Sequence, residues 1–301
     1  MKILVTGGTG LIGKALVCEL ALANNDITVL SRSPQKVYSH FCNEITCWTQ
    51  LNDKQNLNEF DTIINLAGEP IADNRWTPSQ KQKLVNSRCH LTQKLVDLIK
   101  ASDSPPAVFI SGSAVGFYGD QGDTRVTEET PANPEFTHEL CAKWERIALE
   151  AQTPLTRVCL LRTGIVLSTL GGALPKMSKP FKLGLGGKLG SGKQYMPWIH
   201  IDDMVNAIVF LLKNQDAKGA FNLTAPEPVQ NKEFTRLLGK AFNRPALMSV
   251  PESILRLVMG ESATLVLGGQ QAIPEKLLNA GFEFRYPHLE EALKDIITTG
   301  K

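Results

Sequence analysis

A glycine-rich turn near the start of the chain has the residue types and the spacing that bind a phosphate group. Gly7, Gly10 and Gly13 fit a G-x-x-G-x-x-G pattern, and the stretch from Gly8 to Gly13 also fits G-x-G-x-x-G. Such glycines permit a tight turn, a close approach of the backbone to a pyrophosphate, and close packing of the helix that follows. The amino terminus of that helix offers free N–H groups and a positive dipole end to the anion. We therefore expect the following residues to bind a dinucleotide: Thr6, Gly7, Gly10, Leu11, Ile12 and Gly13.

Two other kinds of site fit the sequence only in part. Gly8–Lys14 also spells G-x-x-x-x-G-K, but Ala15 stands where a Ser or Thr must reach magnesium. Ser113 follows an expected strand, but Ser111 occupies the first glycine position of the G-x-S-x-G pattern of hydrolases. The sequence therefore favours neither an ATPase nor a serine hydrolase.

The end of the second expected strand indicates which dinucleotide would bind. An NAD site usually carries an acidic residue there, about 20 residues after the glycines, to bind the ribose 2′-hydroxyl. This chain has Ser31 and Arg32 instead. An arginine can pair bidentately with a 2′-phosphate, and Ser31 can add a hydroxyl. Arg32 could also be a solvated residue at a strand end, but the pattern favours NADP(H).

The elements around these residues predict an α/β fold, a Rossmann-like, doubly wound parallel sheet. Short apolar runs that read as buried strands alternate with segments of helical periodicity. We expect a dinucleotide-binding domain over residues 1–164. Residues 165–301 would form a smaller substrate or capping region, with a small helical domain from about residue 245. The expected strands are 2–5, 27–30, 62–66, 107–110 and 157–161, and the expected helices that separate them lie at 11–20, 80–99 and 137–151.

The second region offers weaker signals. Trp198–Ile201 reads as a strand, and Asp202 is the expected N-cap of a following helix. Lys188 and Lys193 could meet an anionic substrate or could be solvated loop residues. His200 is more typical of a structural histidine than of a ligand.

Composition excludes several classes of protein. Lys plus Arg is 32 and Asp plus Glu is 30, so the net charge of +2 gives no support for nucleic-acid binding through phosphate neutralisation. The chain has no apolar run of 18 residues, so no membrane span is expected, and no signal-peptide pattern opens it. The six cysteines lack C-x-x-C spacing and indicate reduced thiols in a cytoplasmic protein without a metal site. A small molecule is therefore the expected partner.

Four segments together resemble the extended short-chain dehydrogenase/reductases, the group that holds nucleotide-sugar epimerases and dehydratases. Thr6–Gly13 resembles the cofactor loop, and Asn65–Gly68 resembles the fourth-strand motif beside the adenosine. Ser111–Ala114 resembles the fifth-strand segment that carries the catalytic Ser or Thr, and Trp198–Asp203 resembles the segment that opens a late helix. The resemblance implies that Leu66, Ala67 and Gly68 also contact the cofactor.

A closer resemblance is to an atypical epimerase-like subfamily, the YfcH type. It rests on Asn65–Ile71, the pair Ser87 and Arg88, Leu183–Gly187 and Trp198–Ile201. The subfamily implies NADP(H) binding and a small C-terminal domain, without a settled substrate. Arg88 lies in the helix after the fourth strand, where a phosphate contact and an ordinary surface position are equally consistent with the sequence.

The chain departs from the parent family at the catalytic motif. That family uses Tyr-x-x-x-Lys, in which the lysine lowers the pKa of the tyrosine so that it can act as a base. Here Lys143 lies in the expected helix, but Glu139 stands four residues before it. We take Ser113 and Tyr118 as the candidate catalytic residues, with Glu139 as a weaker alternative. In the competing interpretation, Tyr118 packs the cleft wall and Ser113 makes a local hydrogen bond.

These residues lead to two hypotheses. The first is an NADP(H)-dependent oxidoreductase or epimerase-like enzyme that acts on a nucleotide-sugar-like or other small carbonyl or hydroxyl compound. The alternative is a non-catalytic NADP(H)-binding redox sensor or interaction protein, which the missing Tyr-x-x-x-Lys supports. A lyase or transferase on the same scaffold also stays open, because fold does not fix function. The sequence does not decide between a monomer and a homodimer.

Overall fold

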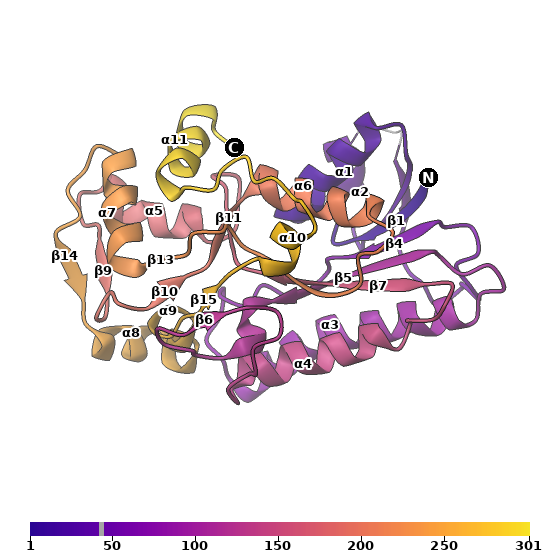
Figure 1. Cartoon of the computed structure of the whole chain (residues 1–301), viewed down its shortest axis with the longest axis horizontal. Helices are drawn as coiled ribbons and strands as arrows, with labels where there is room; N and C mark the ends of the chain where they lie inside the picture. Colours follow the sequence, from indigo (N-terminus) through magenta and orange to yellow (C-terminus); the bar gives the residue numbers. More distant parts are fainter. Residues whose placement is uncertain (42–44) are drawn as a thin grey trace.

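The computed structural model describes residues 1–41 and 45–301, so Cys42 lies outside the described residues. Its centre is a seven-stranded parallel sheet in the order β12-β7-β5-β4-β1-β2-β3 (Figure 1). The strand order reverses between β1 and β4, as it does in doubly wound dinucleotide-binding folds. The predicted fold class is therefore confirmed. The strands are β1 (Lys2–Thr6), β2 (Asp26–Leu30), β3 (Thr46–Trp48), β4 (Thr62–Asn65), β5 (Val108–Ala114), β7 (Arg157–Thr163) and β12 (Gly219–Leu223).

Helices cover both faces of this sheet. In the view of Figure 1, α1 (Leu11–Leu22), α2 (Pro34–Phe41) and α6 (Ile201–Lys213) lie above the sheet. On the other side, α3 (Pro78–Lys100) packs beside α4 (Phe136–Leu149). The strands are buried on both faces, which is why they read as continuous apolar runs.

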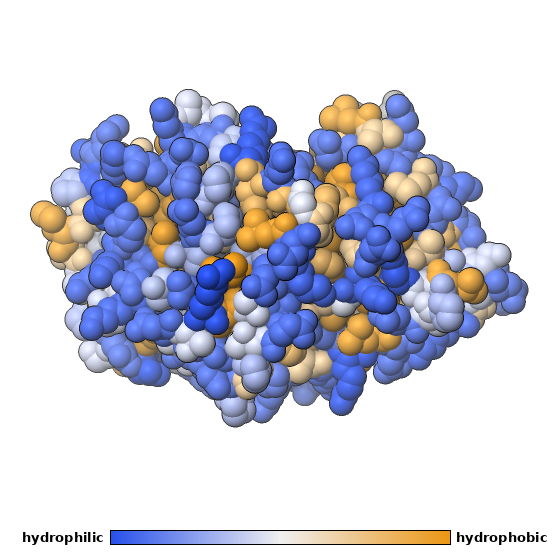
Figure 2. Space-filling model, viewed as in Figure 1, coloured by the Kyte–Doolittle hydropathy of each residue, from blue (hydrophilic) through white to orange (hydrophobic). Residues whose placement is uncertain are grey.

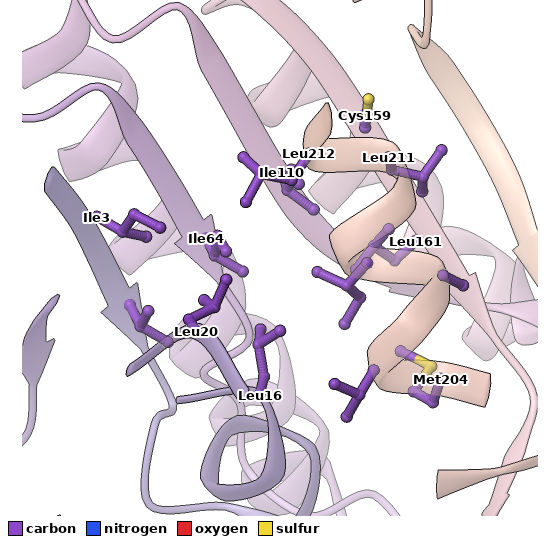
Figure 3. Close-up of a cluster of buried hydrophobic side chains, with 14 of the residues drawn as sticks. Ile3, Leu16, Leu20, Ile64, Ile110, Cys159, Leu161, Met204, Leu211 and Leu212 are labelled. Carbon is purple, nitrogen blue, oxygen red and sulfur yellow. The ribbon is translucent and has the colours of Figure 1, made fainter. Parts of the chain in front are cut away.

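The alternation of side chains along β1 divides the core into two layers. Ile3 and Val5 belong to one cluster, with Leu16 of α1 and Met204 of α6 (Figure 3). Leu4, between them, belongs to the other cluster, with residues of α3 and α4. Successive side chains of a strand point to opposite faces of the sheet, so one strand holds both helical layers.

The boundary expected at residue 164 does not separate the two regions. β12 lies beyond that boundary, yet it pairs in parallel with β7, and α6 packs on α1. The edge of β7 would otherwise expose unpaired N–H and C=O groups, which β12 covers. The sheet thus draws its last strand and one of its helices from the region that we expected to form the cap.

The rest of the second region builds a lobe beyond the carboxyl ends of the strands (Figure 1). Its buried core includes Leu167, Trp198, Phe234 and Leu293. Its elements are β8 (Ile165–Leu167), α5 (Leu174–Lys182), β9 (Gly187–Leu189), β10 (Tyr195–Met196), β11 (Trp198–His200), β13 (Val229–Gln230), α7 (Asn231–Ala241) and β14 (Met248–Val250).

The tail consists mainly of short helices, as the glycines and prolines after residue 245 indicate. One strand of the tail, β15, pairs in parallel with β6 and so returns the chain to the loop that follows β5. The elements not yet named are η2 (Val115–Tyr118), β6 (Arg125–Val126), α8 (Glu252–Met259), η3 (Gly260–Ala263), α9 (Thr264–Leu267), β15 (Gln271–Ala272), α10 (Glu275–Asn279) and α11 (Leu289–Thr299).

Helix α6 does not begin as the sequence predicts. Its N-cap is His200, whose side chain accepts a hydrogen bond from the Asp202 N–H, so the expected Asp202 cap is wrong. Asp202 instead lies in the first turn, where its negative charge interacts favourably with the helix dipole.

The five cysteines in the described part of the chain are free. Across residues 1–41 and 45–301, no helix has the length and apolar character needed to cross a membrane.

Candidate functional site

The glycine turn links the end of β1 to the start of α1 and is as crowded as its sequence predicts. Gly7 has φ of 71°, and a Cβ there would lie 2.7 Å from the Ala67 nitrogen. A Cβ on Gly13 would lie 2.2 Å from the Gly7 carbonyl oxygen. At Gly10 the nearest atom to such a Cβ would be 3.3 Å away, so that position is less confined. The chain therefore needs glycine at Gly7 and Gly13 to make this turn at all.

The amino terminus of α1 is left open toward the surface. Its N-cap, Gly10, has no side chain to cap the helix. The N–H groups of Leu11, Ile12 and Gly13 have no hydrogen-bond partner among the residues that the structure describes. Free N–H groups and the helix dipole together favour an anion at this point. A cradle that any side chain would fill, with donors aimed into it, fits the pyrophosphate of a dinucleotide.

Thr6 and the turn after β4 hold one side of this cradle. The Thr6 hydroxyl donates to Asn65 Oδ1 (2.7 Å) and accepts from the Ala67 N–H (3.2 Å). Asn65 in turn donates to Thr92 of α3 (2.8 Å). Thr6 is fully buried, so its side chain shapes the Leu66–Gly68 turn from within. The turn itself is partly exposed beside the glycines.

Ser31 and Arg32 leave the sheet next to the glycine turn. Thr6 and Leu30 are register partners, so the residues that follow each strand emerge side by side. The Ser31 hydroxyl accepts from the Ser33 N–H (3.2 Å), which fixes the bend after β2. Arg32 is exposed and forms no ion pair with any described residue. Its guanidinium is therefore available to a phosphate.

Arg88 already has partners within the protein. Its Nη1 donates to the Leu84 carbonyl (3.1 Å) and its Nη2 to the Glu69 carbonyl (2.9 Å). The guanidinium lies against Gly68, where a Cβ would come within 3.0 Å of it. Burial is the main reason that the pKa of Arg88 is lowered. Arg88 thus braces the turn after β4, and its remaining N–H groups are the ones that could reach a ligand.

The side of α4 that faces the sheet does not carry the two residues expected from the sequence. Glu139 and Lys143 are exposed, on the face away from the sheet. The buried side chains of α4 as far as Glu145 are instead Thr137, Leu140, Cys141, Trp144 and Glu145. Burial raises the pKa of the Cys141 thiol to about 12, so it is a neutral group beside Ser113. Neither Glu139 nor Lys143 belongs to the buried face of α4, so the weaker base candidate gains no support.

Ser113 belongs to a buried charge network. Its hydroxyl donates to Glu145 Oε1 (2.6 Å), and Ser113 is only 6% exposed. Both carboxylate oxygens of Glu145 accept from Arg162, each at 2.9 Å. The carboxylate raises the pKa of the guanidinium further above its usual range, against the effect of burial. Two buried charges are tolerable because they pair with ideal bidentate geometry.

Tyr118 lies inside the same network. It is fully buried, its hydroxyl donates to Asn222 Oδ1 (2.7 Å), and it accepts from Arg162 Nη1 (3.0 Å). Burial, partly offset by Arg162, raises its pKa to about 12. A tyrosine with this pKa and no exposed surface is poorly suited to exchange protons with a substrate. The geometry matches the competing interpretation, in which Tyr118 packs and Ser113 bonds locally.

The network continues to the tail of the chain. Glu128 accepts from the backbone N–H groups of Asn222 (2.9 Å) and Lys276 (3.3 Å), and Asn222 Nδ2 donates to the Ile273 carbonyl (2.9 Å). Glu128, Glu145, Arg162 and Asn222 were not among the residues expected to matter. Arg162 directly follows the buried apolar run Val158–Leu161 of β7. A charge in such a position must be paired, and this signal in the sequence could have revealed it.

His138, in the first turn of α4, contacts Phe117, whose ring lies against the Arg162 guanidinium. Its Nδ1 lies 2.7 Å from the Phe117 carbonyl oxygen, and its ring meets the Phe117 ring edge to face. A carbonyl only accepts, so Nδ1 carries a proton and the neutral ring has its lone pair on Nε2. His138 is partly exposed. The partly exposed ring can therefore accept a proton at Nε2.

One group of possible metal ligands occurs in the described part of the chain: His200, Asp202 and Asp295. His200 Nδ1 accepts from the Asp202 N–H, so the neutral ring carries its proton on Nε2, 3.2 Å from Asp295. Lys301 Nζ already lies 2.6 Å from the Asp202 carboxylate. The ring of His200 stacks on Tyr286 at 3.9 Å. With its lone pair committed and a cation in place, this group fits a structural role.

A surface hollow lies elsewhere on the molecule. It measures about 480 Å³ and is lined by Met1, Ala107, Thr153 and Lys213, among others, near the amino ends of the strands. The carboxyl ends carry the glycine turn and the free helix terminus. Ligands bind at the carboxyl ends in sheets of this topology, so we locate the site there.

Comparisons with family models divide the chain in two. Residues 3–224 match the model of the NAD dependent epimerase/dehydratase family. Residues 250–296 match a separate model, that of a domain of unknown function.

Individual relatives match over nearly the whole length. An epimerase family protein of Staphylococcus aureus is 39% identical over 297 residues, which cover 98% of each chain. A chloroplastic epimerase family protein of Arabidopsis thaliana, named as an SDR39U1 homolog, is 40% identical over 99% of this chain and 87% of its own. The crystal structure of the human epimerase family protein SDR39U1 (isoform 2) with NADPH has a TM-score of 0.91 at 34% identity, and covers 99% of both chains.

Proposed function

Because the chain belongs to the NAD-dependent epimerase/dehydratase family, we propose that it binds NADP(H) at the glycine turn and transfers hydride to or from a small hydroxyl or carbonyl compound. The observation that carries this proposal is the similarity to a human relative solved with NADPH, over 99% of both chains. The open amino terminus of α1 and the exposed Arg32 support it in this chain. Bound nicotinamide would supply the hydride chemistry.

In this proposal, each residue at and beside the glycine turn has a definite role in cofactor binding. The N–H groups of Leu11, Ile12 and Gly13 would bind the pyrophosphate, and Gly7 and Gly10 would let it approach. Arg32, with Ser31 beside it, would pair with the 2′-phosphate and so select NADP(H) over NAD(H). Thr6 would act through the turn that it supports, with Leu66, Ala67 and Gly68 on the adenosine side. Arg88 would brace that turn.

The reaction itself has fewer candidate residues. Ser113 donates its only proton to Glu145, so toward the cleft its oxygen can only accept a hydrogen bond. In this proposal Ser113 would orient a substrate hydroxyl, while Tyr118 would position Arg162 from behind. His138, with its Nε2 lone pair free, is the group best placed to exchange a proton.

A non-catalytic NADP(H)-binding protein is the second candidate function. It is favoured by one specific observation, that Ser113 and Tyr118 both have their hydrogen-bond partners inside the protein: Glu145 for Ser113, and Asn222 and Arg162 for Tyr118. An enzyme of this family needs a proton donor at the nicotinamide, and the usual one is missing from the sequence.

The two candidates are separated by following NADPH consumption over a panel of aldehydes and ketones, with three variants. If the first candidate holds, the wild type and Tyr118→Phe consume NADPH with the same pH profile. His138→Asn should lose the profile, because asparagine keeps a donor for the Phe117 carbonyl but has no Nε2. Ser113→Ala should raise KM more than it lowers kcat. NADPH binding without consumption across the panel would favour the second candidate.

A further inference from the structure

One stretch of the chain is strongly one-sided in charge. Residues 151–201 contain no Asp or Glu, but they contain five lysines and two arginines. Both arginines are engaged inside the protein: Arg157 donates to three backbone carbonyls, and Arg162 pairs with Glu145. The lysines, in contrast, are all exposed and lie on α5, β9 and the loop that follows. The charge of this stretch is therefore displayed at the surface of the second lobe.

Most of these lysines lack an internal counter-ion. Lys176 pairs with Asp73, whereas Lys179, Lys182 and Lys188 form no ion pair with any described residue. Three acidic side chains of α7, α8 and α11 nearby already pair with other cations. The pairs are Glu233 with Arg236, Glu252 with Arg256, and Glu290 with Lys240. Glu291 of α11 is exposed and forms no ion pair with a described residue. The charges left over at this end of the molecule are thus mainly positive.

Large apolar side chains protrude from the same place. Leu183 is 75% exposed and Leu185 is 58% exposed, in the turn that follows α5. Leu247 is 87% exposed and Met248 is 53% exposed, at the start of β14. The two segments are adjacent, because the Met248 N–H donates to the Gly186 carbonyl (3.2 Å) and β14 pairs with β9. Four large apolar side chains therefore extend into solvent from neighbouring turns.

The lysines surround these turns. Lys182 directly precedes Leu183, and its Nζ lies 5.5 Å from the Phe242 ring, just before the second turn. Lys188 lies in β9 and is the register partner of Ser249 in β14. β9 and β14 form the left end of the molecule in Figure 1, and Figure 2 shows hydrophobic side chains among hydrophilic ones at that end. This end lies across the lobe from the glycine turn and leaves the cofactor site uncovered.

We propose that this end of the molecule, the turns 183–186 and 244–248 with Lys179, Lys182 and Lys188, binds the surface of an anionic lipid bilayer. Protruding apolar turns fit the interfacial region of a bilayer, where leucine and methionine leave water. Unpaired lysines around them are attracted to acidic headgroups. An acidic protein groove or a nucleic acid would use the charge, but it would leave the protruding leucines in water. The contact is peripheral and does not span the membrane.

The test is co-sedimentation of the full chain with two kinds of vesicle, phosphatidylcholine alone and phosphatidylcholine mixed with phosphatidylglycerol. We expect binding to the mixed vesicles only, and we expect it to weaken as salt is raised, because exposed charges are screened. Leu185→Ser with Leu247→Ser should lower the binding by at least about tenfold, since burying even one leucine contributes that much. Lys182→Glu with Lys188→Glu should abolish it.

Matched controls come from the other lobe. Leu22 is 80% exposed at the end of α1, and Lys213 is exposed at the end of α6. Leu22→Ser with Lys213→Glu should bind the mixed vesicles as the wild type does. The proposal is overturned if the wild type fails to bind mixed vesicles, if it binds both kinds equally, or if the control variant loses binding too. Retention of the chain on heparin without vesicle binding would also overturn it and would indicate a general polyanion site.

Discussion

Two regions at the carboxyl ends of the strands, one around the glycine turn and one around β5 and α4, differ in how their polar groups are paired. Around the glycine turn, donors are left without protein partners: the first N–H groups of α1 and the Arg32 guanidinium face outward. Around β5 and α4, the polar groups of Ser113, Glu145, Arg162 and Tyr118 bond to one another. Around the glycine turn, hydrogen-bond donors are free to bind a ligand. Around β5 and α4, the polar groups stabilise the fold instead.

In the proposed function, this difference lets a chain that lacks Tyr-x-x-x-Lys still bind a cofactor at the glycine turn. The glycine turn depends on backbone geometry, which few substitutions can supply. The Tyr-x-x-x-Lys motif depends on two side chains of one helix, and none of the buried residues of α4 is a tyrosine or a lysine. Stability at the second region comes from satisfying buried charges, and binding at the first region comes from leaving donors unsatisfied.

The largest expected effect is on the buried ion pair. Arg162→Met leaves the Glu145 carboxylate buried without its cation, and we expect the free energy of unfolding to fall by about 3–5 kcal/mol. Urea denaturation measures this loss. NADPH affinity should change much less, because the pair lies in the region around β5 and α4, where the polar groups stabilise the fold.

The matched control is the double variant Arg162→Met with Glu145→Leu. Replacing both charges removes the unpaired carboxylate, so most of the lost stability should return. A single-variant loss below about 1 kcal/mol would mean that the pair is solvated rather than buried, and the contrast between the two regions would break.

The opposite pattern is expected at the glycine turn. Gly13→Ala places a Cβ where only 2.2 Å separates it from the Gly7 carbonyl, so the turn must open. We expect a stability loss of about 1–3 kcal/mol together with loss of NADPH binding. Gly10→Ala, with 3.3 Å available, should be milder in both measurements. Equal effects of the two substitutions would contradict the steric account.

A smaller effect is expected from Tyr118→Phe, which removes hydrogen bonds to Asn222 and Arg162. The loss at neutral pH should be about 1–2 kcal/mol. The folded pKa of Tyr118 is raised to about 12 from an ordinary value of 10.0, so its contribution to stability is present below pH 10.0. Above that pH the unfolded chain releases its proton first, and the contribution is lost as the pH rises toward 12.

As the pH rises from 10.0 to about 12, the free energy of unfolding of Tyr118→Phe should therefore fall less than that of the wild type. The difference between wild type and variant isolates Tyr118 from the buried Cys141 and Cys159 thiols, whose pKa values are also raised by burial. Parallel stability curves for the two proteins in alkali would show that Tyr118 is not buried as described.

The sequence predicts the sheet and the glycine turn because their signals are local. Apolar runs mark the strands, and three glycines at fixed spacing mark the turn. It does not predict the fate of Tyr118, because its partners Arg162 and Asn222 come 44 and 104 residues later. A hydroxyl near the end of a strand looks the same in sequence whether it faces a cleft or a buried guanidinium.

The predicted register of α4 and the predicted extent of the first region could both have been more accurate. Leu140, Cys141 and Trp144 form an apolar stripe that already turns Glu139 and Lys143 outward, so the pattern contained the answer. The boundary at residue 164 followed a change in glycine content. It missed that a parallel edge strand and its crossover helix, β12 and α6, were still to come.

Equilibrium titration with NADPH and NADH tests most directly whether the glycine turn binds a dinucleotide and whether Arg32 selects NADP(H). Wild type and Arg32→Glu are titrated side by side with calorimetry. We predict that the wild type binds NADPH more tightly than NADH. In Arg32→Glu the affinity for NADPH should fall by about 10–100-fold, the value of a charge-assisted hydrogen bond, while the affinity for NADH changes little. Equal binding of NADPH by the two proteins, or no binding of either cofactor by the wild type, would contradict the account.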